Sequence, residues 1–249
     1  MPLELDLYAR VALVTGGAKG IGRGITEALQ QAGATVVTCG RGEAPDGPAA
    51  DHRICDVRDP DAVQALVRDV AADHGRLDVL VNNAGGAPAT EAATASARFH
   101  ERVVGLNLLA PLAAAQAAHG VMAQQAGGGV VVNISSIAAH RPAPTIAAYA
   151  AAKAGLDSLT ASLAMEWGPA VRVNAVDVGL CRTEHTTDHY GGDARVAAIE
   201  RTIPLRRMAR PAEVGAVVAF LASDLASYVS GAVVACHGGG EPPVFLHVD

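Results

Sequence analysis

The feature that most constrains the fold of this chain is the alternation of short apolar runs with longer segments of helical character. Strands that are apolar throughout and alternate with helices are typical of a parallel sheet buried on both faces. We therefore predict an α/β fold: a doubly wound sheet of seven parallel strands with helices on both sides. The predicted strands are Arg10–Thr15, Thr35–Cys39, Arg53–Cys55, Val79–Val81, Val130–Ile134, Val171–Ala175 and Ala232–Ala235, and the predicted helices are Gly20–Gln31, Asp59–Asp73, Ala97–Gln125, Ala147–Trp167 and Pro211–Ala222.

The rest of the chain completes this plan. No repeat, linker or break in composition separates a second domain, so we expect residues 1–249 to form one domain. We expect Pro111 to break or restart the helix Ala97–Gln125, because proline removes a backbone donor. Gly40–Ala50 is a predicted loop. Residues from Cys181 to Met208 form a polar, irregular stretch, and we predict a substrate-binding lid over about 181–210.

Charge and cysteine content exclude several classes of function. The formal net charge is −6 and no basic tract occurs, so we expect neither a nucleic acid nor a membrane as partner. The amino-terminal stretch MPLELDLYAR lacks the apolar core of a signal peptide, and no apolar run approaches the roughly 18 residues of a membrane span. The four cysteines show no CxxC spacing, so we predict a cytoplasmic protein without a metal site.

A glycine-rich turn follows the first predicted strand. Gly16, Gly20 and Gly22 lie in the stretch TGGAKGIG and open the next helix with the spacing GxxxGxG. Backbone amides at a helix amino terminus, without side chains in the way, suit the pyrophosphate of a dinucleotide. The alternative is a tight turn that needs glycine only for packing. We favour phosphate binding, because this turn follows the first strand.

The end of the second strand bears on the choice of cofactor. An acid there favours NAD, and a cation favours the 2′-phosphate of NADP. Arg41 stands at this position, no acid occurs before Glu43, and Lys19 in the glycine turn is a second cation. We therefore predict a preference for NADP(H), with NAD(H) possible. The alternative is that Arg41 and Lys19 are solvated surface charges.

Two further loops follow strand ends, where open parallel sheets bind ligands. Asp56 and Val57 come after the third strand, and Asp56 is a candidate acceptor for the adenine amino group. Asn83, Ala84 and Gly85 come after the fourth strand, where the backbone would approach a ribose. An ordinary turn is the alternative for this second loop.

The stretch from Ser135 to Lys153 carries the groups that favour proton transfer. Tyr149 and Lys153 are four residues apart, which places both side chains on one helix face. A nearby ammonium lowers the pKa of a phenol and so activates it as a base. Ser136 follows the fifth strand and its hydroxyl suits a substrate oxygen. An amphipathic surface helix is the alternative, since a tyrosine and a lysine at this spacing are common.

Four motifs in order resemble the short-chain dehydrogenase/reductase family, in its single-domain branch with members similar to 3-oxoacyl-ACP reductases. They are TGGAKGIG (15–22), NNAG (82–85), VNISS (132–136) and YAAAK (149–153). The resemblance covers nearly the whole chain and implies a Rossmann fold. The chain departs from the family in the turn after the sixth strand. Where the family often has a Pro-Gly pair, this chain has Val178 and Gly179, preceded by Asp177, and the turn without proline leads to Thr183.

The resemblance also implies a role for each matching residue. Tyr149 would be the general acid/base, Lys153 would lower its pKa and bind the nicotinamide ribose, and Ser136 would orient the substrate oxygen. Asn107 would hold a water molecule in a proton relay, although an asparagine in a helix often bonds only backbone. Thr183 would meet the nicotinamide carboxamide, although a threonine after a strand is often a cap. The implied cofactor-binding set is Gly16, Lys19, Gly20, Ile21, Gly22, Arg41, Asp56, Val57, Asn83, Ala84, Gly85, Tyr149, Lys153 and Thr183.

The expected function is hydride transfer between nicotinamide and a carbonyl or secondary alcohol carbon of a small molecule, in an NADP(H)-dependent ketoreductase. The alternatives are an NAD-linked dehydrogenase of secondary alcohols of hydroxyacyl or hydroxysteroid type and a non-catalytic dinucleotide-binding regulator. Relatives in the family pair two helices to form tetramers, so we expect a homotetramer or a dimer. The polar residues that border the expected pocket receive no catalytic role: His140, Arg141, His185, His189 and Tyr190.

Overall fold

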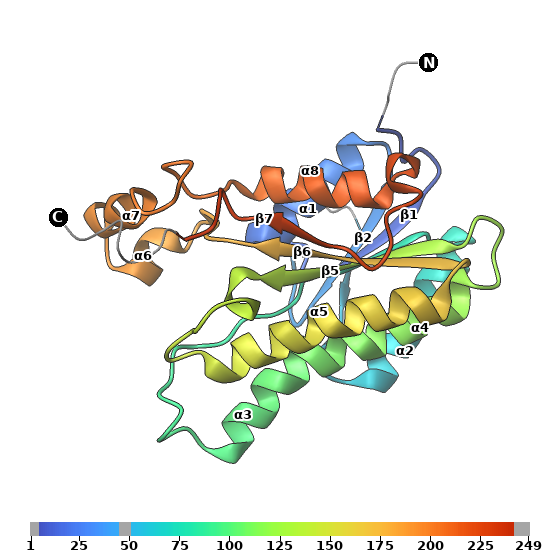
Figure 1. The fold of residues 1–249 in the computed structure, drawn as a ribbon. Coiled ribbons are helices and arrows are strands. Elements are labelled where there is room, and N and C mark those ends of the chain that lie inside the picture. The colour runs from blue at the N-terminus through green and yellow to red at the C-terminus, as the bar shows by residue number, and fades with distance from the viewer. Residues whose placement is uncertain (1–4, 45–50, 242–249) are drawn as a thin grey trace.

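The computed structural model describes residues 5–44 and 51–241 and shows a sheet between two layers of helices (Figure 1). Seven parallel strands follow the order β3-β2-β1-β4-β5-β6-β7, so the predicted doubly wound α/β fold is confirmed. After β3 the chain returns to the centre of the sheet, where β4 pairs with β1. Such folds bind ligands at the carboxyl ends of the strands, at this point where the strand order reverses. The strands are β1 (Val11–Thr15), β2 (Thr35–Gly40), β3 (Asp51–Ile54), β4 (Val79–Asn82), β5 (Gly129–Ser136), β6 (Val171–Val178) and β7 (Val233–Cys236).

Each face of the sheet has its own apolar core. On one face, α1 (Gly20–Gln31) and α8 (Pro211–Ala222) cover a cluster that includes Val14, Ile25 and Val218. On the other face lie α2 (Pro60–His74), α4 (Ala110–Met122) and α5 (Ala147–Trp167). Small residues let the helices approach closely, since a Cβ atom at Gly215 of α8 would lie 2.3 Å from the Gly24 carbonyl oxygen of α1. Aliphatic side chains thus fill both cores almost without aromatic ones.

The sequence close to each element predicted where several helices and strands begin and end. Asp59, where a helix was predicted to begin, caps α2, because its carboxylate accepts from the backbone N–H groups of Asp61 and Ala62 at 3.0 and 3.2 Å. Strand β3 begins at Asp51, two residues before the predicted start, because Asp51 already pairs with Val37 of β2. Part of the loop predicted over 40–50 lies outside the described residues.

Of the two outcomes predicted at Pro111, a break in the helix was wrong, whereas α-helical structure does restart there, because α4 begins at Ala110 with Pro111 in its first turn. Helix α3 (Ala97–Val104) passes through a π-helical turn, η1 (Gly105–Leu109), directly into α4. The wider turn accommodates a residue that cannot donate to the Asn107 carbonyl and whose ring would crowd it. By length and composition alone Ala97–Met122 would suit a membrane span, but Ala114, Ala118 and Met122 are buried in the core.

The stretch from Cys181 to Met208 is more regular than predicted. It contains two short helices, α6 (Thr186–Tyr190) and α7 (Asp193–Glu200), which are too short to show a clear periodicity in sequence. A small apolar cluster of Val196, Ile203 and Met208 holds the segment together. In Figure 1 this segment lies beside the carboxyl ends of β5 and β6.

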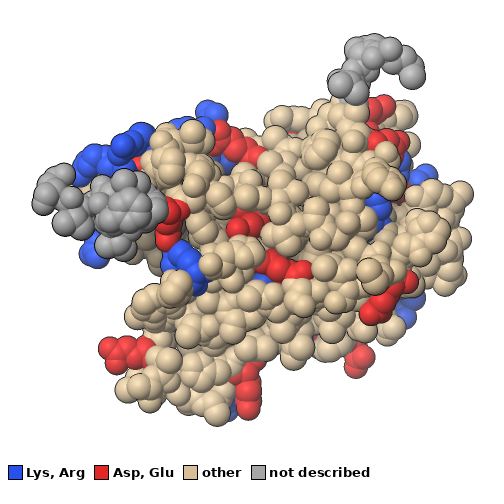
Figure 2. Space-filling view, in the orientation of Figure 1, with Lys and Arg blue, Asp and Glu red and all other residues tan. Residues whose placement is uncertain are grey.

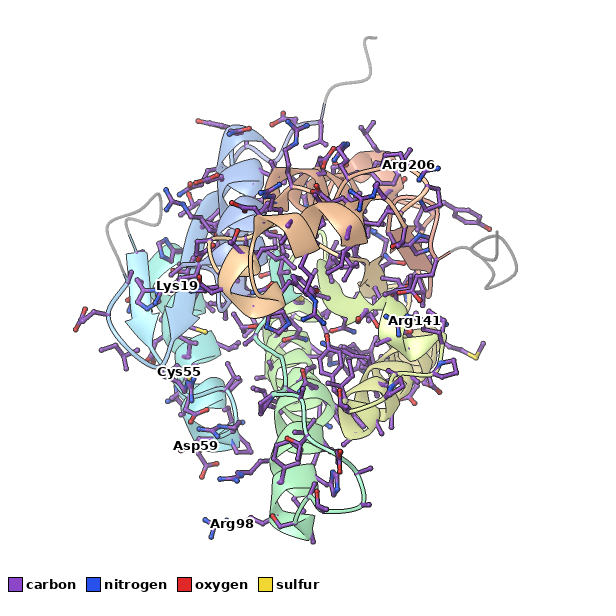
Figure 3. All side chains as sticks on the ribbon, turned by 90° about the vertical axis from the view of Figure 1, so that its left-hand side faces the viewer. Lys19, Cys55, Asp59, Arg98, Arg141 and Arg206 are labelled. Carbon is purple, nitrogen blue, oxygen red and sulfur yellow. The ribbon has the colours of Figure 1, made fainter. Side chains whose placement is uncertain are left out.

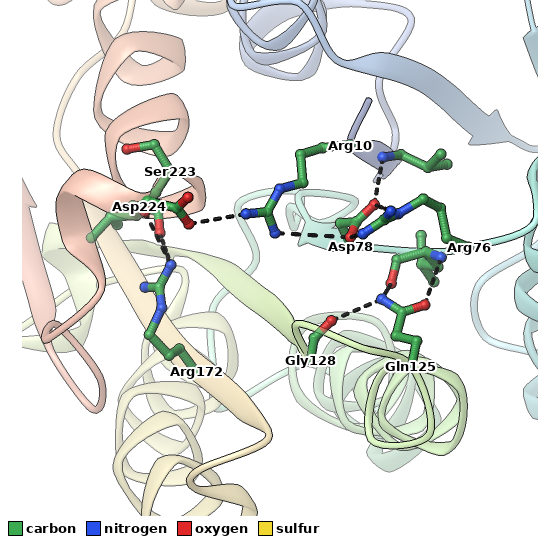
Figure 4. Close-up of polar contacts among 11 residues, drawn as sticks. Arg10, Arg76, Asp78, Gln125, Gly128, Arg172, Ser223 and Asp224 are labelled. Atoms are coloured by element: carbon green, nitrogen blue, oxygen red, sulfur yellow. Dashed lines mark hydrogen bonds and ion pairs between the residues drawn. The ribbon is translucent and has the colours of Figure 1, made fainter. Parts of the chain in front are cut away.

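The opposite edge of the sheet carries a network of charges around Asp78 (Figure 4). The buried Asp78 carboxylate accepts from the backbone N–H of Val11 at 2.8 Å and from Arg76 at 2.7 and 2.6 Å. Arg10 lies 3.9 Å from Asp78 and bonds the exposed Asp224 at 3.0 Å. This network joins the starts of β1 and β4, far from the carboxyl ends of the strands.

Candidate active site

Two adjoining hollows lie at the carboxyl edge of the sheet. The first has a volume of about 390 Å³ and the second about 490 Å³, and both are lined by Gly16, Lys19, Ala84 and Gly85. Figure 2 shows the molecule hollowed at this edge. In Figure 3, which faces the edge, Lys19 and Cys55 lie on one side and Arg141 on the other. The shared lining makes the two hollows one continuous cleft.

Ser136, Tyr149 and Lys153 line the first hollow together. Ser136 is the last residue of β5, and the other two lie one turn apart on α5. The buried Lys153 ammonium donates to the Ile134 carbonyl oxygen at 2.7 Å, and its Nζ lies 5.7 Å from the centre of the Tyr149 ring. A hydroxyl, a phenol and an ammonium therefore converge in one cavity.

Burial governs the protonation of these groups. It raises the pKa of the Tyr149 phenol, although a hydrogen bond with Ser136 acts in the opposite direction. It also lowers the pKa of Lys153 to about 8, while the charge of Asp157 opposes this shift. At neutral pH this environment holds the phenol protonated and leaves the ammonium close to its titration.

Asn107 lies beside this cluster but does not line either hollow. Its side-chain amide bonds both backbone groups of Gly86, accepting at 2.8 Å and donating at 3.0 Å, and also donates to the Val103 carbonyl at 2.9 Å. A Cβ atom at Gly85 would lie 2.8 Å from Asn107 Oδ1 and 3.5 Å from Lys153 Nζ. The side chain thus braces the loop after β4, as the backbone-bonding alternative describes.

The glycine turn after β1 has the shape of an anion cradle. Gly16 adopts a φ of +64°, and its N–H donates to the Cys39 carbonyl at 2.8 Å. A Cβ atom at Gly22 would lie 2.1 Å from the Gly16 carbonyl oxygen, so only glycine fits there. The Gly20 N–H, at the start of α1, donates to the Glu184 carboxylate at 3.2 Å. This amide of the turn therefore already binds an anionic oxygen, and the turn fits a phosphate group.

The second hollow holds the residues predicted for the adenosine end. Arg41, Asp56 and Val57 line it, together with Glu43 and His52. Arg58 bonds Asp56 with its Nε at 2.9 Å and lowers the pKa of that carboxyl to about 2. The carboxylate is therefore an ionised acceptor at neutral pH.

The remaining predicted residues border the cleft in different ways. Thr183 and Val178 line the first hollow, and the Gly179 N–H donates to the Cys236 carbonyl at 3.1 Å, so the turn without proline is held by β7. Asn83 lines the same hollow, but its side-chain amide donates to the Thr15 and Gly16 carbonyls at 2.9 and 3.1 Å. Of the predicted set, Gly20 and Asn107 alone line neither hollow.

Sequence reasoning missed three groups at this site. Glu184 contacts the glycine turn, although its place next to Thr183 was a usable signal. Asp157 lies one turn beyond Lys153, and that spacing also pointed to it. His140 received no catalytic role, yet its Nε2 lies 3.2 Å from Asp157 Oδ2 and 3.6 Å from Asp177 Oδ2. The spacing of His140, Asp157 and Asp177 along the chain does not predict that these three side chains meet.

A doubly wound parallel sheet with this cleft, glycine turn and Ser-Tyr-Lys cluster defines a class of dinucleotide-dependent oxidoreductases. Residues 16–241 match the family model described as enoyl-(acyl carrier protein) reductase. The chain belongs to the short-chain dehydrogenase/reductase family. It is accordingly an oxidoreductase that acts on CH–OH or C=O groups of a small molecule with NAD(P)(H).

Relatives cover nearly the whole chain. It is 40% identical over 244 residues to cis-4-hydroxycyclohexanecarboxylate dehydrogenase of Sinomonas cyclohexanicum, covering 92% of this chain and 96% of that one. It is 32% identical over 249 residues to 2-dehydro-3-deoxy-D-gluconate 5-dehydrogenase of Pseudoalteromonas atlantica, covering 95% and 97%. Among solved structures, ligand-free aldohexose dehydrogenase of Thermoplasma acidophilum superposes with a TM-score of 0.91 at 30% identity, covering 96% and 97%.

Proposed function

We propose that the protein is an NADP(H)-dependent ketoreductase in which Tyr149 is the general acid/base, with Ser136 and Lys153 as its partners. The observation that carries this proposal is the convergence of the three side chains in the hollow that the glycine turn also lines. A bound dinucleotide would have its nicotinamide half in this hollow, beside Tyr149 and Lys153, and its adenosine half in the second, beside Arg41 and Asp56. The dinucleotide supplies the hydride when bound.

The chain's own groups manage the oxygen and its proton. The Ser136 hydroxyl binds the substrate oxygen and directs it toward the Tyr149 phenol. The buried phenol is protonated at neutral pH, so it donates its proton to the oxygen as the carbonyl is reduced. The Lys153 ammonium stabilises the phenolate that remains. The protonated phenol is the form that the reductive direction requires, and the phenolate is the form that the oxidative direction requires.

Replacement of Tyr149 by phenylalanine tests this proposal. We expect Tyr149→Phe to lower turnover by a factor of about 100 or more, because the proton donor is lost, while NADPH still binds. The assay is NADPH oxidation with a panel of cyclic ketones and 3-oxoacyl thioesters, and the reverse reaction with cis-4-hydroxycyclohexanecarboxylate and hydroxysteroids. The control is Tyr228→Phe, since Tyr228 is fully exposed. Equal turnover in both variants would exclude the phenol from the reaction.

We also propose NADP(H) rather than NAD(H) as the preferred cofactor. Arg41 and Lys19 line the second hollow and supply two cations for a 2′-phosphate, whereas Glu43 in the same hollow is the acid that NAD would use. We expect Arg41→Ala to weaken NADPH binding by a factor of about 10 and to leave NADH binding unchanged. The measurement is fluorescence titration with both cofactors. Arg23→Ala is the control, because Arg23 is paired with Glu27 on α1 and lines neither hollow.

Each outcome separates the candidate functions. Preference for NADPH that disappears in Arg41→Ala supports the reductase. Tighter NADH binding that Glu43→Gln weakens would instead favour an NAD-linked dehydrogenase of secondary alcohols. Binding of either cofactor without turnover across the panel would favour a non-catalytic regulator.

Three further features complete the proposal. The segment 181–210 is proposed to cover bound substrate, because Thr183 borders the first hollow.

A homotetramer, or a dimer, would cover Leu109 and Met165, which are 55% and 87% exposed beside α4 and on α5. Light scattering tests this assembly. The four free cysteines fit the reducing cytoplasm.

A further inference from the structure

Lys153 is one of two lysines in the chain, and its charge is poorly compensated by the contacts of its own ammonium group. Lys153 is 3% exposed, and its Nζ donates to the Ile134 carbonyl oxygen, a neutral acceptor. An ammonium group buried beside neutral acceptors tends to lose its proton. The proposed reaction needs the charged form, so a negative charge has to lie nearby.

Asp157 is placed to supply that charge. It follows Lys153 by four residues on α5, so both side chains lie on the face that packs against the sheet. Asp157 is 9% exposed, and its charge acts on Lys153 to favour the ammonium. A carboxylate in this position stabilises the ammonium through a medium of low polarity.

Asp157 does not stand alone. His140, directly after the short helix η2 (Ile137–Ala139), places Nε2 3.2 Å from Asp157 Oδ2 and 3.6 Å from Asp177 Oδ2. Asp177 is buried on β6, in register with Ser135 on β5. Both carboxylate oxygens thus lie within ion-pair distance of the same ring nitrogen. His140 thus bridges two buried carboxylates beneath α5.

We propose that Asp157, bridged to Asp177 by His140, is a positioning residue that keeps the Lys153 ammonium charged. This inference rests on the proposed role of Lys153 beside Tyr149, and it adds three residues that do not touch the substrate. The His140 side chain is 53% exposed and connects the cluster with solvent. Asp157 and Asp177 line neither hollow.

The other charges around this cluster act in known directions. Burial raises the pKa values of Asp157 and Asp177, and the charge of His140 lowers both. The charge of His237, which follows β7, also lowers the pKa of Asp177. The charge of Asp177 in turn raises the pKa of Tyr149. Without His140 the two carboxyl groups would lose the charge that lowers their pKa values, which would weaken the negative field at Lys153.

The two lysines of the chain allow a direct test. Protein labelled with carbon-13 at the lysine side chains gives two ε-carbon NMR signals, and Lys153→Met assigns them. In the parent protein Lys153 should titrate near a pKa of about 8. We expect Asp157→Asn to lower that midpoint by about half a unit or more. Lys19 is exposed, and its signal is the control within the same sample.

A second variant keeps the test decisive if the first variant does not fold. His140→Gln alters a half-exposed side chain, and we expect a smaller downward shift of the Lys153 midpoint. A Lys153 midpoint that stays in place in folded Asp157→Asn overturns the proposal. If Asp157→Asn does not fold, as judged by circular dichroism, His140→Gln decides in the same way. The titration needs no substrate, so its result is separate from the Tyr149→Phe assay, which tests the proposed function itself.

Discussion

Lys19 and Lys153 line the same hollow in a chain whose 19 basic lysine and arginine residues include no other lysine. Lys19 stays exposed in the glycine turn, whereas Lys153 is buried beside Tyr149. The two ammonium groups therefore meet opposite conditions within one cavity. Water surrounds the first, while the second depends on neighbouring groups for its charge.

Glu184 is the residue that would compete with a bound dinucleotide. Its carboxylate accepts the Gly20 N–H at 3.2 Å, at the amino terminus of α1 where a phosphate oxygen would bind. We expect Glu184→Gln to tighten NADPH binding by a factor of about 3 to 10, because a like charge is removed from the phosphate site. Fluorescence titration measures the change.

The matched control for this prediction lies on the same segment. Asp188→Asn removes an equal charge from α6, and Asp188 makes no contact with the glycine turn in the described structure. Its NADPH affinity should stay within a factor of about 2 of the parent. Equal tightening in both variants would indicate a general effect of charge rather than competition by Glu184.

Helices α4 and α5 are tied to the sheet by a chain of buried amides. Asn82 on β4 donates to the Pro111 carbonyl and to Asn133 Oδ1 at 3.1 and 2.9 Å. Asn133 on β5 then donates to Thr160 Oγ on α5 at 2.9 Å. These bonds hold α5 at a fixed height over the sheet, and this height places Tyr149 and Lys153 at the end of β5.

Loss of the middle amide should loosen this arrangement. We expect Asn133→Ala to lower the free energy of unfolding by about 2–4 kcal/mol, because Asn82 and Thr160 lose buried partners. Ser162→Ala removes an exposed hydroxyl from α5 and should change stability by less than about 0.5 kcal/mol. Urea unfolding followed by circular dichroism compares the two. A similar small loss in both would show that the buried chain contributes little.

The two edges of the sheet divide stability from chemistry in the whole molecule. The carboxyl edge carries the glycine turn and the proposed catalytic groups, with open hollows and several polar groups at close range. The other edge is closed by Asp78 with Arg76 and Arg10, as Figure 4 shows. A substitution at that edge should therefore alter unfolding without altering cofactor binding.

Asp78 and Asp224 provide a matched pair for this prediction. Asp78 is 1% exposed, and Asp78→Ala leaves the Val11 N–H without its acceptor, so we expect a loss of about 2–4 kcal/mol in unfolding free energy. Asp224 is an exposed partner of Arg10, and Asp224→Ala should cost less than about 1 kcal/mol. Thermal and urea unfolding measure both. A loss of NADPH affinity in folded Asp78→Ala would contradict the division between the edges.

Much of the fold was predictable because local patterns encode it. Apolar runs predicted the positions of the strands, although β3 is itself mostly polar and begins before its predicted start, and the helix predicted from Asp59 matches α2. Pro111 stands in the first turn of α4 and does not break the helix, because its effect depends on the π-helical turn before it. Helices α6 and α7 escaped notice because five and eight residues carry too little periodicity.

By itself, the sequence determined the alternation of elements, the glycine turn and the pairing of Tyr149 with Lys153, because each depends on residues close together in the chain. Tertiary structure decided which charges surround them. Glu184 meets Gly20 across 164 residues, and His140, Asp157 and Asp177 meet only because β5, β6 and α5 pack together. Burial shifts the pKa of Lys153, and burial is a property of the packed molecule that no local spacing reveals.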